Sequence, residues 1–167
     1  MQLLFVRHAP AGDRAKYAKT GRPDAERPLT PAGIRKMKKA ARGLKRILST
    51  LDLVATSPLK RARQTAHIVA DAFSAVKIAE FEELSPSREP KELAARLRSL
   101  KGARVVALVG HEPHLSSAVA HMISGGSKLR LELKKGACCL VGFDRTPEAG
   151  AGTLLWSLAP AHLRKLS

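Results

Sequence analysis

At 167 residues, the chain is long enough to bury a full hydrophobic core, and we expect a single domain over residues 1–167. Its 30 lysines and arginines against 14 aspartates and glutamates give a formal net charge of +16, which attracts anions such as phosphorylated groups, acidic proteins or nucleic acid. The sequence has no run of about 18 uncharged apolar residues, which argues against a membrane span. The apolar start before Arg7 is too short for a signal peptide and lacks its basic region.

The first part of the chain predicts a strand, a loop and a long helix. Leu3–Val6 is a continuous apolar run, typical of a strand buried on both faces. Residues 9–29 are polar and contain several Gly and Pro residues, which indicates a loop. Thr30 as N-cap and Pro31 as first helical residue then predict a helix over residues 31–49. Its expected apolar stripe consists of Ile34, Met37, Ala41, Leu44 and Leu48.

The other face of helix 31–49 is strongly basic. It carries Arg35, Lys36, Lys38, Lys39, Arg42, Lys45 and Arg46. A charge run of this kind is most often a solvated helix surface. The functional alternative is an electrostatic landing surface for an acidic phosphoprotein or another polyanion.

The middle of the chain predicts a second strand and helix of the same kind. Leu53–Thr56 is a short apolar strand, and Ser57-Pro58 repeats the cap-then-proline signal for a helix that extends to about Phe73. The next elements expected are a short strand at Val76–Ala79, a polar loop at Glu80–Pro90 and a helix at Lys91–Leu100.

The last part of the chain contains the clearest buried strand, Arg104–Val109. Gly110–Pro113 then turns into a helix whose apolar residues include Leu115 and Val119. Three further strands are expected, at Leu129–Leu133, Ala137–Phe143 and Thr153–Leu158. The order of these elements predicts an α/β fold with a mostly parallel central sheet and helices on both faces.

The only two cysteines, Cys138 and Cys139, are adjacent within an apolar run. They provide neither a disulfide framework nor a metal-ligand spacing. We expect both side chains to be buried and the protein to reside in the reducing cytoplasm.

Polar clusters follow three of the buried strands, and they carry the functional prediction. Arg7-His8, Ser57 to Arg61 and Gly110-His111-Glu112 would meet at one edge of a parallel sheet, where sites form in open α/β folds. Two arginines match phosphate oxygens, and an imidazole can attack phosphorus. Without an aspartate cluster for a metal, these residues describe a phosphate pocket that works without a metal or a cofactor.

Four sequence blocks resemble the histidine phosphatase superfamily, also called the phosphoglycerate mutase-like family. Residues 3–9 resemble its Arg-His signature, residues 57–66 its arginine-containing block, and residues 109–113 the block with its second histidine. Residues 27–33 resemble a block of the short SixA-like branch of bacterial phosphohistidine phosphatases. The resemblance implies a three-layer sandwich in which His8 becomes the phosphohistidine intermediate.

The same resemblance assigns roles to the other site residues. By this resemblance, Arg7, Arg61 and His111 would bind the phosphoryl oxygens. Apart from the resemblance, Ser57 is a further substrate-binding candidate, although its expected place as an N-cap is a sufficient structural reason for it. Arg14 and Arg22, in the loop after His8, are candidates for substrate contacts.

The proton donor is a departure from the family pattern. Larger members place a glutamate after a leucine in the loop before the third helix, and Pro86 stands at that place here. Glu112, beside His111, and Glu83 are the substitutes. Alternatively no strong acid is needed, because the imidazole of a phosphohistidine leaves more easily than an alkoxide.

The leading functional prediction is a phosphatase acting on a phosphorylated protein, such as a histidine phosphotransfer domain, and releasing inorganic phosphate. A second reading is a phosphatase of small phosphorylated metabolites or nucleotides. A third, from another class, is a polyanion- or nucleic-acid-binding module with a vestigial phosphate site. Six aromatic residues and the lack of a known nucleic-acid motif argue against the third reading.

Overall fold

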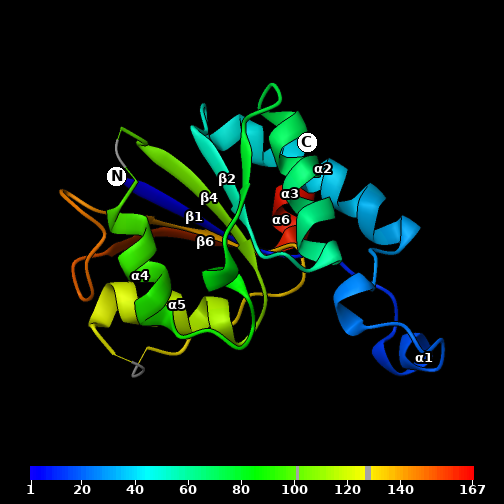
Figure 1. Ribbon diagram of the computed structural model, residues 1–167. Helices are drawn as coiled ribbons and strands as arrows, with labels where there is room; N and C mark the ends of the chain where they lie inside the picture. Colours follow the sequence, from blue (N-terminus) through cyan, green and yellow to red (C-terminus); the bar gives the residue numbers. More distant parts are fainter. Residues whose placement is uncertain (101, 127–128) are drawn as a thin grey trace.

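The structure, a computed structural model, describes residues 1–100, 102–126 and 129–167 (Figure 1). The strands are β1 (Gln2–Arg7), β2 (Leu53–Thr56), β3 (Ile78–Glu80), β4 (Val105–Gly110), β5 (Cys138–Gly142) and β6 (Thr153–Leu158). The α-helices are α1 (Arg14–Ala18), α2 (Pro31–Ile47), α3 (Lys60–Ala72), α4 (Pro90–Arg98), α5 (His114–Ser124) and α6 (Pro160–Lys165). Two 3-10 helices, η1 (Asp24–Glu26) and η2 (Glu82–Leu84), lie in loops. None of the described helices is both long and apolar enough to cross a membrane.

The strands form one sheet in the order β3-β2-β4-β1-β5-β6. The pairs β3-β2, β2-β4 and β4-β1 are parallel, while β5 runs antiparallel to both β1 and β6. The predicted α/β fold with a mostly parallel sheet is therefore confirmed. Because β1, β2 and β4 are parallel neighbours, their carboxyl ends reach the same edge of the sheet.

Helices cover both faces of the sheet, which confirms the three-layer arrangement (Figure 1). Alternate residues of β1 separate the two cores: Leu4 and Val6 pack with α2, α3 and α6, whereas Leu3 and Phe5 pack with α4 and α5. Cys138 and Cys139 divide between the two cores in the same way, and both are buried, as expected.

Leu129–Leu133 is not a strand, contrary to the prediction. Its alternating leucines follow the period of a strand, but the segment is not among the six strands of the described sheet. Leu133 is fully buried and Leu131 packs against the α4–α5 core, so the alternation reflects an extended segment anchored on the core. The backbone oxygen of Leu133 accepts a hydrogen bond from Arg7 Nη1 at 2.7 Å.

Other differences concern short elements. The predicted loop over residues 9–29 contains α1, which Asp13 caps by accepting from the Lys16 amide, and η1. Helix α3 begins at Lys60 with Leu59 as its N-cap, so the expected cap by Ser57 is wrong. The six-residue helix α6 was not expected, although Pro160 at its first position is a recognisable start signal.

Candidate active site

The ends of three neighbouring strands bring the predicted clusters together. The β1–β4 register pairs Arg7 with Gly110, and the β2–β4 register pairs Thr56 with Val109. The residues that come next, His8, Ser57 and His111, therefore emerge side by side at the carboxyl edge of the sheet. A cavity of about 700 Å³ opens there. It is lined by Arg7, His8, Ala11, Gly12, Asp13, Arg14, Asp24, Arg27, Leu59, Arg61, Pro86, His111, Glu112 and Lys135.

His8 is held as a neutral imidazole with one defined tautomer. Its Nδ1 lies 2.7 Å from the backbone oxygen of Ala9, and because a carbonyl can only accept, Nδ1 carries the hydrogen. The lone pair is then on Nε2. Burial lowers the pKa of His8 from 6.5 to about 4, with a smaller contribution from the charges of Arg61 and Arg7. Nε2 is therefore unprotonated, and able to act as a nucleophile, at neutral pH.

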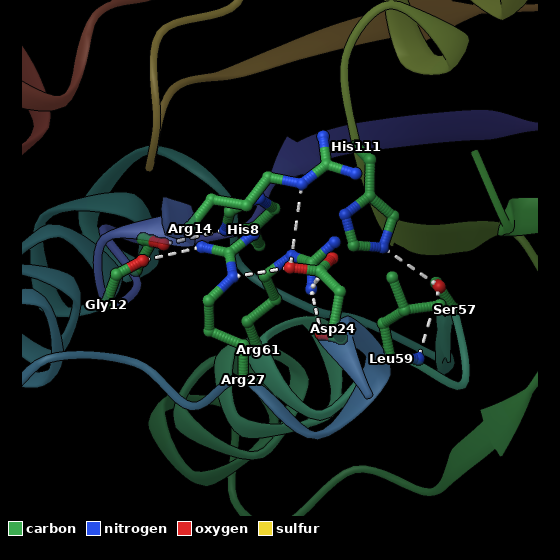
Figure 2. Close-up of polar contacts among 10 residues, drawn as sticks. His8, Gly12, Arg14, Asp24, Arg27, Ser57, Leu59, Arg61 and His111 are labelled. Carbon is green, nitrogen blue, oxygen red and sulfur yellow. Dashed lines mark hydrogen bonds and ion pairs between the residues drawn. The ribbon is translucent and has the colours of Figure 1, made fainter. Parts of the chain in front are cut away.

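His111 lies beside His8, with 5.0 Å between the ring centroids. Its Nε2 is 3.0 Å from the Ser57 hydroxyl oxygen, and its Nδ1 is buried with no hydrogen-bond partner in the part of the chain that the structure describes. Figure 2 shows Nδ1 on the side of the ring that faces His8. Burial, followed by the charges of His8 and Arg61, lowers the pKa of His111 to about 3. When Ser57 donates its hydroxyl hydrogen to Nε2, Nδ1 carries a hydrogen that can be donated into the cavity.

Ser57 contacts His111 but is not one of the residues that line the cavity. It is fully buried, and its oxygen also lies 3.4 Å from the Leu59 amide. The structure thus places Ser57 in contact with a site histidine, where it can orient the imidazole, instead of on the substrate side.

Arg7 and Arg61 each leave a buried nitrogen without a partner. Arg7 Nε and Arg61 Nε have no hydrogen-bond partner among the described residues, although both side chains are otherwise anchored. His111 Nδ1 is a third such nitrogen, and the three residues that carry them line one cavity. An unpaired buried donor costs about 1–3 kcal/mol, so this arrangement favours a ligand rich in acceptor oxygens.

A carboxylate at the centre of three arginines was missed by the sequence analysis. Asp24 lies 2.7 Å from Arg27 Nε, 3.2 Å from Arg61 Nη1 and 3.9 Å from Arg14 Nε. Figure 2 shows Asp24 between these arginines. The hydrogen bond from Arg27 is the main cause that lowers the pKa of Asp24. Asp24 is therefore ionised at neutral pH and holds Arg61 at the cavity. The signal available in the sequence was an acidic residue, Asp24, three positions before Arg27, the first residue of the family-like block at residues 27–33.

The remaining candidates divide between the cavity and the outside. Glu112 and Pro86 line the cavity, whereas Glu83 does not. Glu112 Oε2 accepts from the Ser116 hydroxyl, and its Oε1 is buried with no partner among residues 1–100, 102–126 and 129–167. Arg14 lines the cavity and Arg22 does not. Within the described residues, no three His, Cys, Asp or Glu side chains are grouped so as to hold a metal ion.

Comparison with known proteins agrees with this geometry. Residues 3–86 match the histidine phosphatase superfamily (branch 1). An uncharacterised protein of Picosynechococcus sp. is 36% identical over 137 residues, covering 81% of this chain and 81% of that protein.

Solved structures share the whole fold. The protein histidine phosphatase SixA, complexed with tungstate, superimposes with a TM-score of 0.81 and 29% identity, over 98% of this chain and 99% of that one. The alpha-ribazole phosphatase of Shigella flexneri has a TM-score of 0.73 and 18% identity, over 96% and 97% of the two chains, a likeness of fold alone. This chain belongs to the histidine phosphatase superfamily, in its SixA-like branch.

Proposed function

We propose that this protein is a metal-independent phosphatase in which His8 accepts the phosphoryl group, and that its substrate is a protein phosphorylated on histidine. The observation that carries the proposal is the set of unpaired groups in the cavity. Arg7 Nε, Arg61 Nε and His111 Nδ1 are buried without a partner among the described residues, and these three residues line the same cavity as His8, whose Nε2 carries the lone pair. A phosphoryl group supplies oxygens for the donors and an electrophilic phosphorus for the nucleophile.

In the first step, Nε2 of His8 attacks phosphorus, and the bond from phosphorus to the substrate nitrogen breaks. The hydrogen bond from Nδ1 to the Ala9 oxygen stabilises the positive charge that develops on the ring. Arg7, Arg61 and His111 stabilise the charge on the phosphoryl oxygens. Glu112 donates a proton to the departing imidazole through its unpaired Oε1.

In the second step, a water molecule attacks the phosphoryl group on His8. Glu112, now a carboxylate, takes the proton from this water, and the bond between phosphorus and Nε2 breaks. Inorganic phosphate leaves and His8 returns to its neutral form. Asp24 does not serve as the proton donor in this scheme because its carboxylate is held by Arg27 and Arg61.

Two observations support phosphohistidine as the substrate. Pro86 lines the cavity where larger family members place a glutamate donor, and a weak general acid penalises an alkoxide leaving group more than an imidazole. The protein histidine phosphatase SixA is also 29% identical over nearly the whole chain. The two buried cysteines, which form no disulfide, support placing this activity in the cytoplasm.

The test compares wild type with His8→Ala on a chemically phosphorylated histidine phosphotransfer domain and on phosphoserine, with EDTA present. We expect hydrolysis of the phosphohistidine protein to survive EDTA and to fall by about 10³-fold or more in the variant. His67→Ala, which changes an exposed histidine of α3, is the matched control and retains activity. Undiminished turnover by His8→Ala would contradict the mechanism, and faster turnover of phosphoserine would favour small phosphorylated metabolites.

A further inference from the structure

The positive charge of this protein is concentrated on one helix. Between Arg27 and Leu51 the sequence contains eight basic residues and no acidic one. Seven of the eight lie on α2, and all seven are exposed: Arg35, Lys36, Lys38, Lys39, Arg42, Lys45 and Arg46. None of the ion pairs found within the described part of the chain involves these side chains. The charge of α2 is thus not neutralised by the fold.

Helix α6 extends this charged surface. Gly43 of α2 packs against the backbone of Leu163, so the two helices lie side by side on the same face of the sheet. Arg164 and Lys165 of α6 are at least partly exposed, and the helix has no acidic residue. We call the exposed cations of α2 and α6, together with Lys135, the basic face.

The basic face is continuous with the active site. Lys135 lines the cavity that contains His8, and it also lines a small neighbouring cleft. Lys36 of α2 and Arg164 of α6 line that cleft too, beside Ala9 and Pro10 of the loop that follows His8. Lys135 therefore links the phosphate cavity to the basic face, with no acidic side chain in the cleft. The rim formed by α1 and η1 differs, because it carries acidic as well as basic residues.

We propose that the basic face docks an acidic surface that flanks the phosphorylated histidine of the substrate protein. The inference rests on the proposed function and names where the partner binds. A partner with carboxylates beside its phosphorylated side chain engages both parts at once, since the phosphoryl group enters the cavity while the carboxylates meet α2 and α6. Complementary charge of this kind raises the rate of association and fixes orientation.

Two features favour an acidic protein over a nucleic acid. Attack by His8 requires a terminal phosphoryl group, which the internal phosphodiesters of a duplex do not present. Neither α2 nor α6 contains a Phe, Tyr or Trp on which bases could stack.

The experiment uses two peptides that contain one histidine and differ only in the flank, which is about six glutamates or about six glutamines. The unphosphorylated peptides are used for binding, and the same peptides phosphorylated with phosphoramidate are used for turnover. At about 50 mM salt we expect the glutamate peptide to bind about 10-fold more tightly and to show a correspondingly lower KM. Both differences shrink at about 500 mM salt, where surface charges are screened.

Two triple variants with the same loss of charge locate the effect. Lys36→Gln/Lys39→Gln/Arg164→Gln removes cations of the basic face, and we expect it to abolish the preference for the glutamate peptide. Lys77→Gln/Arg98→Gln/Arg104→Gln removes three exposed cations elsewhere and keeps the preference. Turnover of p-nitrophenyl phosphate, which reports the catalytic residues alone, stays unchanged in both.

Equal binding of the two peptides by wild type, or an equal loss of preference in both triple variants, overturns the docking proposal. Tighter binding of an RNA or DNA duplex than of the glutamate peptide, lost in the basic-face variant, overturns it in favour of a nucleic-acid surface. Binding of the unphosphorylated peptides tests the docking proposal independently of catalysis. A wild-type protein that binds the glutamate peptide but hydrolyses neither phosphopeptide contradicts the proposed function and leaves the docking surface supported.

Discussion

Pro86 lines the cavity at a position where a residue able to donate a proton would assist the departure of the leaving group. It lies in the loop after η2 and lines the same cavity as His8 and Glu112, but a proline side chain cannot transfer a proton. Glu112 is anchored at Oε2 by Ser116, so only Oε1 faces the reaction in our scheme. A single carboxylate in this arrangement suits a leaving group that needs little protonation.

We predict that Pro86→Glu adds a second acid and broadens the substrate range. Hydrolysis of phosphoserine, an alkyl phosphoester, should rise by about 10-fold or more, within the usual range of general acid catalysis. Hydrolysis of the phosphohistidine protein should change little. Steady-state kinetics on both substrates check this. Pro86→Gln is the control, because glutamine has nearly the shape of glutamate but cannot donate a proton as an acid. An equal gain in Pro86→Gln would show that proton donation is not the cause.

At the scale of elements, strand periodicity and strand ends were sufficient to predict where the site forms. Arg7-His8 and His111 each follow a continuous apolar run, and parallel pairing necessarily brings such ends together. Asp24 escaped prediction because it lies in a 3-10 turn within a loop, where no periodicity marks a residue as inward-facing. Leu129–Leu133 was misassigned for the opposite reason: its leucines do alternate, but its backbone pairs with no strand in the described part of the chain.

Two glycines of helix α2 contact two different parts of the molecule. Substitutions at them can therefore separate the effect of α2 on the position of the loop after His8 from its effect on the stability of the fold. A Cβ on Gly33 would collide with the backbone oxygen of Pro10, two residues after His8, and a Cβ on Gly43 would collide with the backbone oxygen of Leu163. We predict that each alanine substitution lowers the free energy of unfolding by about 1–3 kcal/mol.

Only Gly33→Ala should also lower kcat, by about 10-fold or more, because it displaces the loop that holds the His8 ring. Urea unfolding and turnover of p-nitrophenyl phosphate measure the two effects. Gly126→Ala, where a Cβ meets no atom of the described residues within 4 Å, is the control. Equal kcat values for Gly33→Ala and Gly43→Ala would show that α2 does not position the loop.

At the scale of the whole molecule, the buried histidines make stability depend on pH. The pKa of His8 is about 4 in the folded protein and near 6.5 when the chain unfolds. Between these values the unfolded chain binds a proton that the folded protein excludes. The folded state therefore loses stability as pH falls from 6.5 towards 4, by at most about 1.4 kcal/mol per pH unit for one group.

We predict that His8→Gln removes this part of the pH dependence. Urea unfolding at about pH 7.5, 5.5 and 4.5 should show the variant gaining stability relative to wild type as the pH falls. Subtracting the two curves cancels the contribution of groups that both proteins share, such as Asp24. A constant difference across this range would mean that His8 titrates normally in the folded protein.

The central claim is that Nε2 of His8 carries the phosphoryl group during turnover. The most direct measurement is to mix the enzyme with the phosphohistidine protein, stop the reaction in alkali, and locate the phosphate by ³¹P NMR and peptide mass spectrometry. Glu112→Gln, which slows the attack of water in our scheme, should let the intermediate accumulate. We predict phosphate on Nε2 of His8, because Nδ1 is occupied by its hydrogen bond to Ala9. Phosphate on Nδ1 or on another residue, or turnover in which His8 is never phosphorylated, would contradict the account.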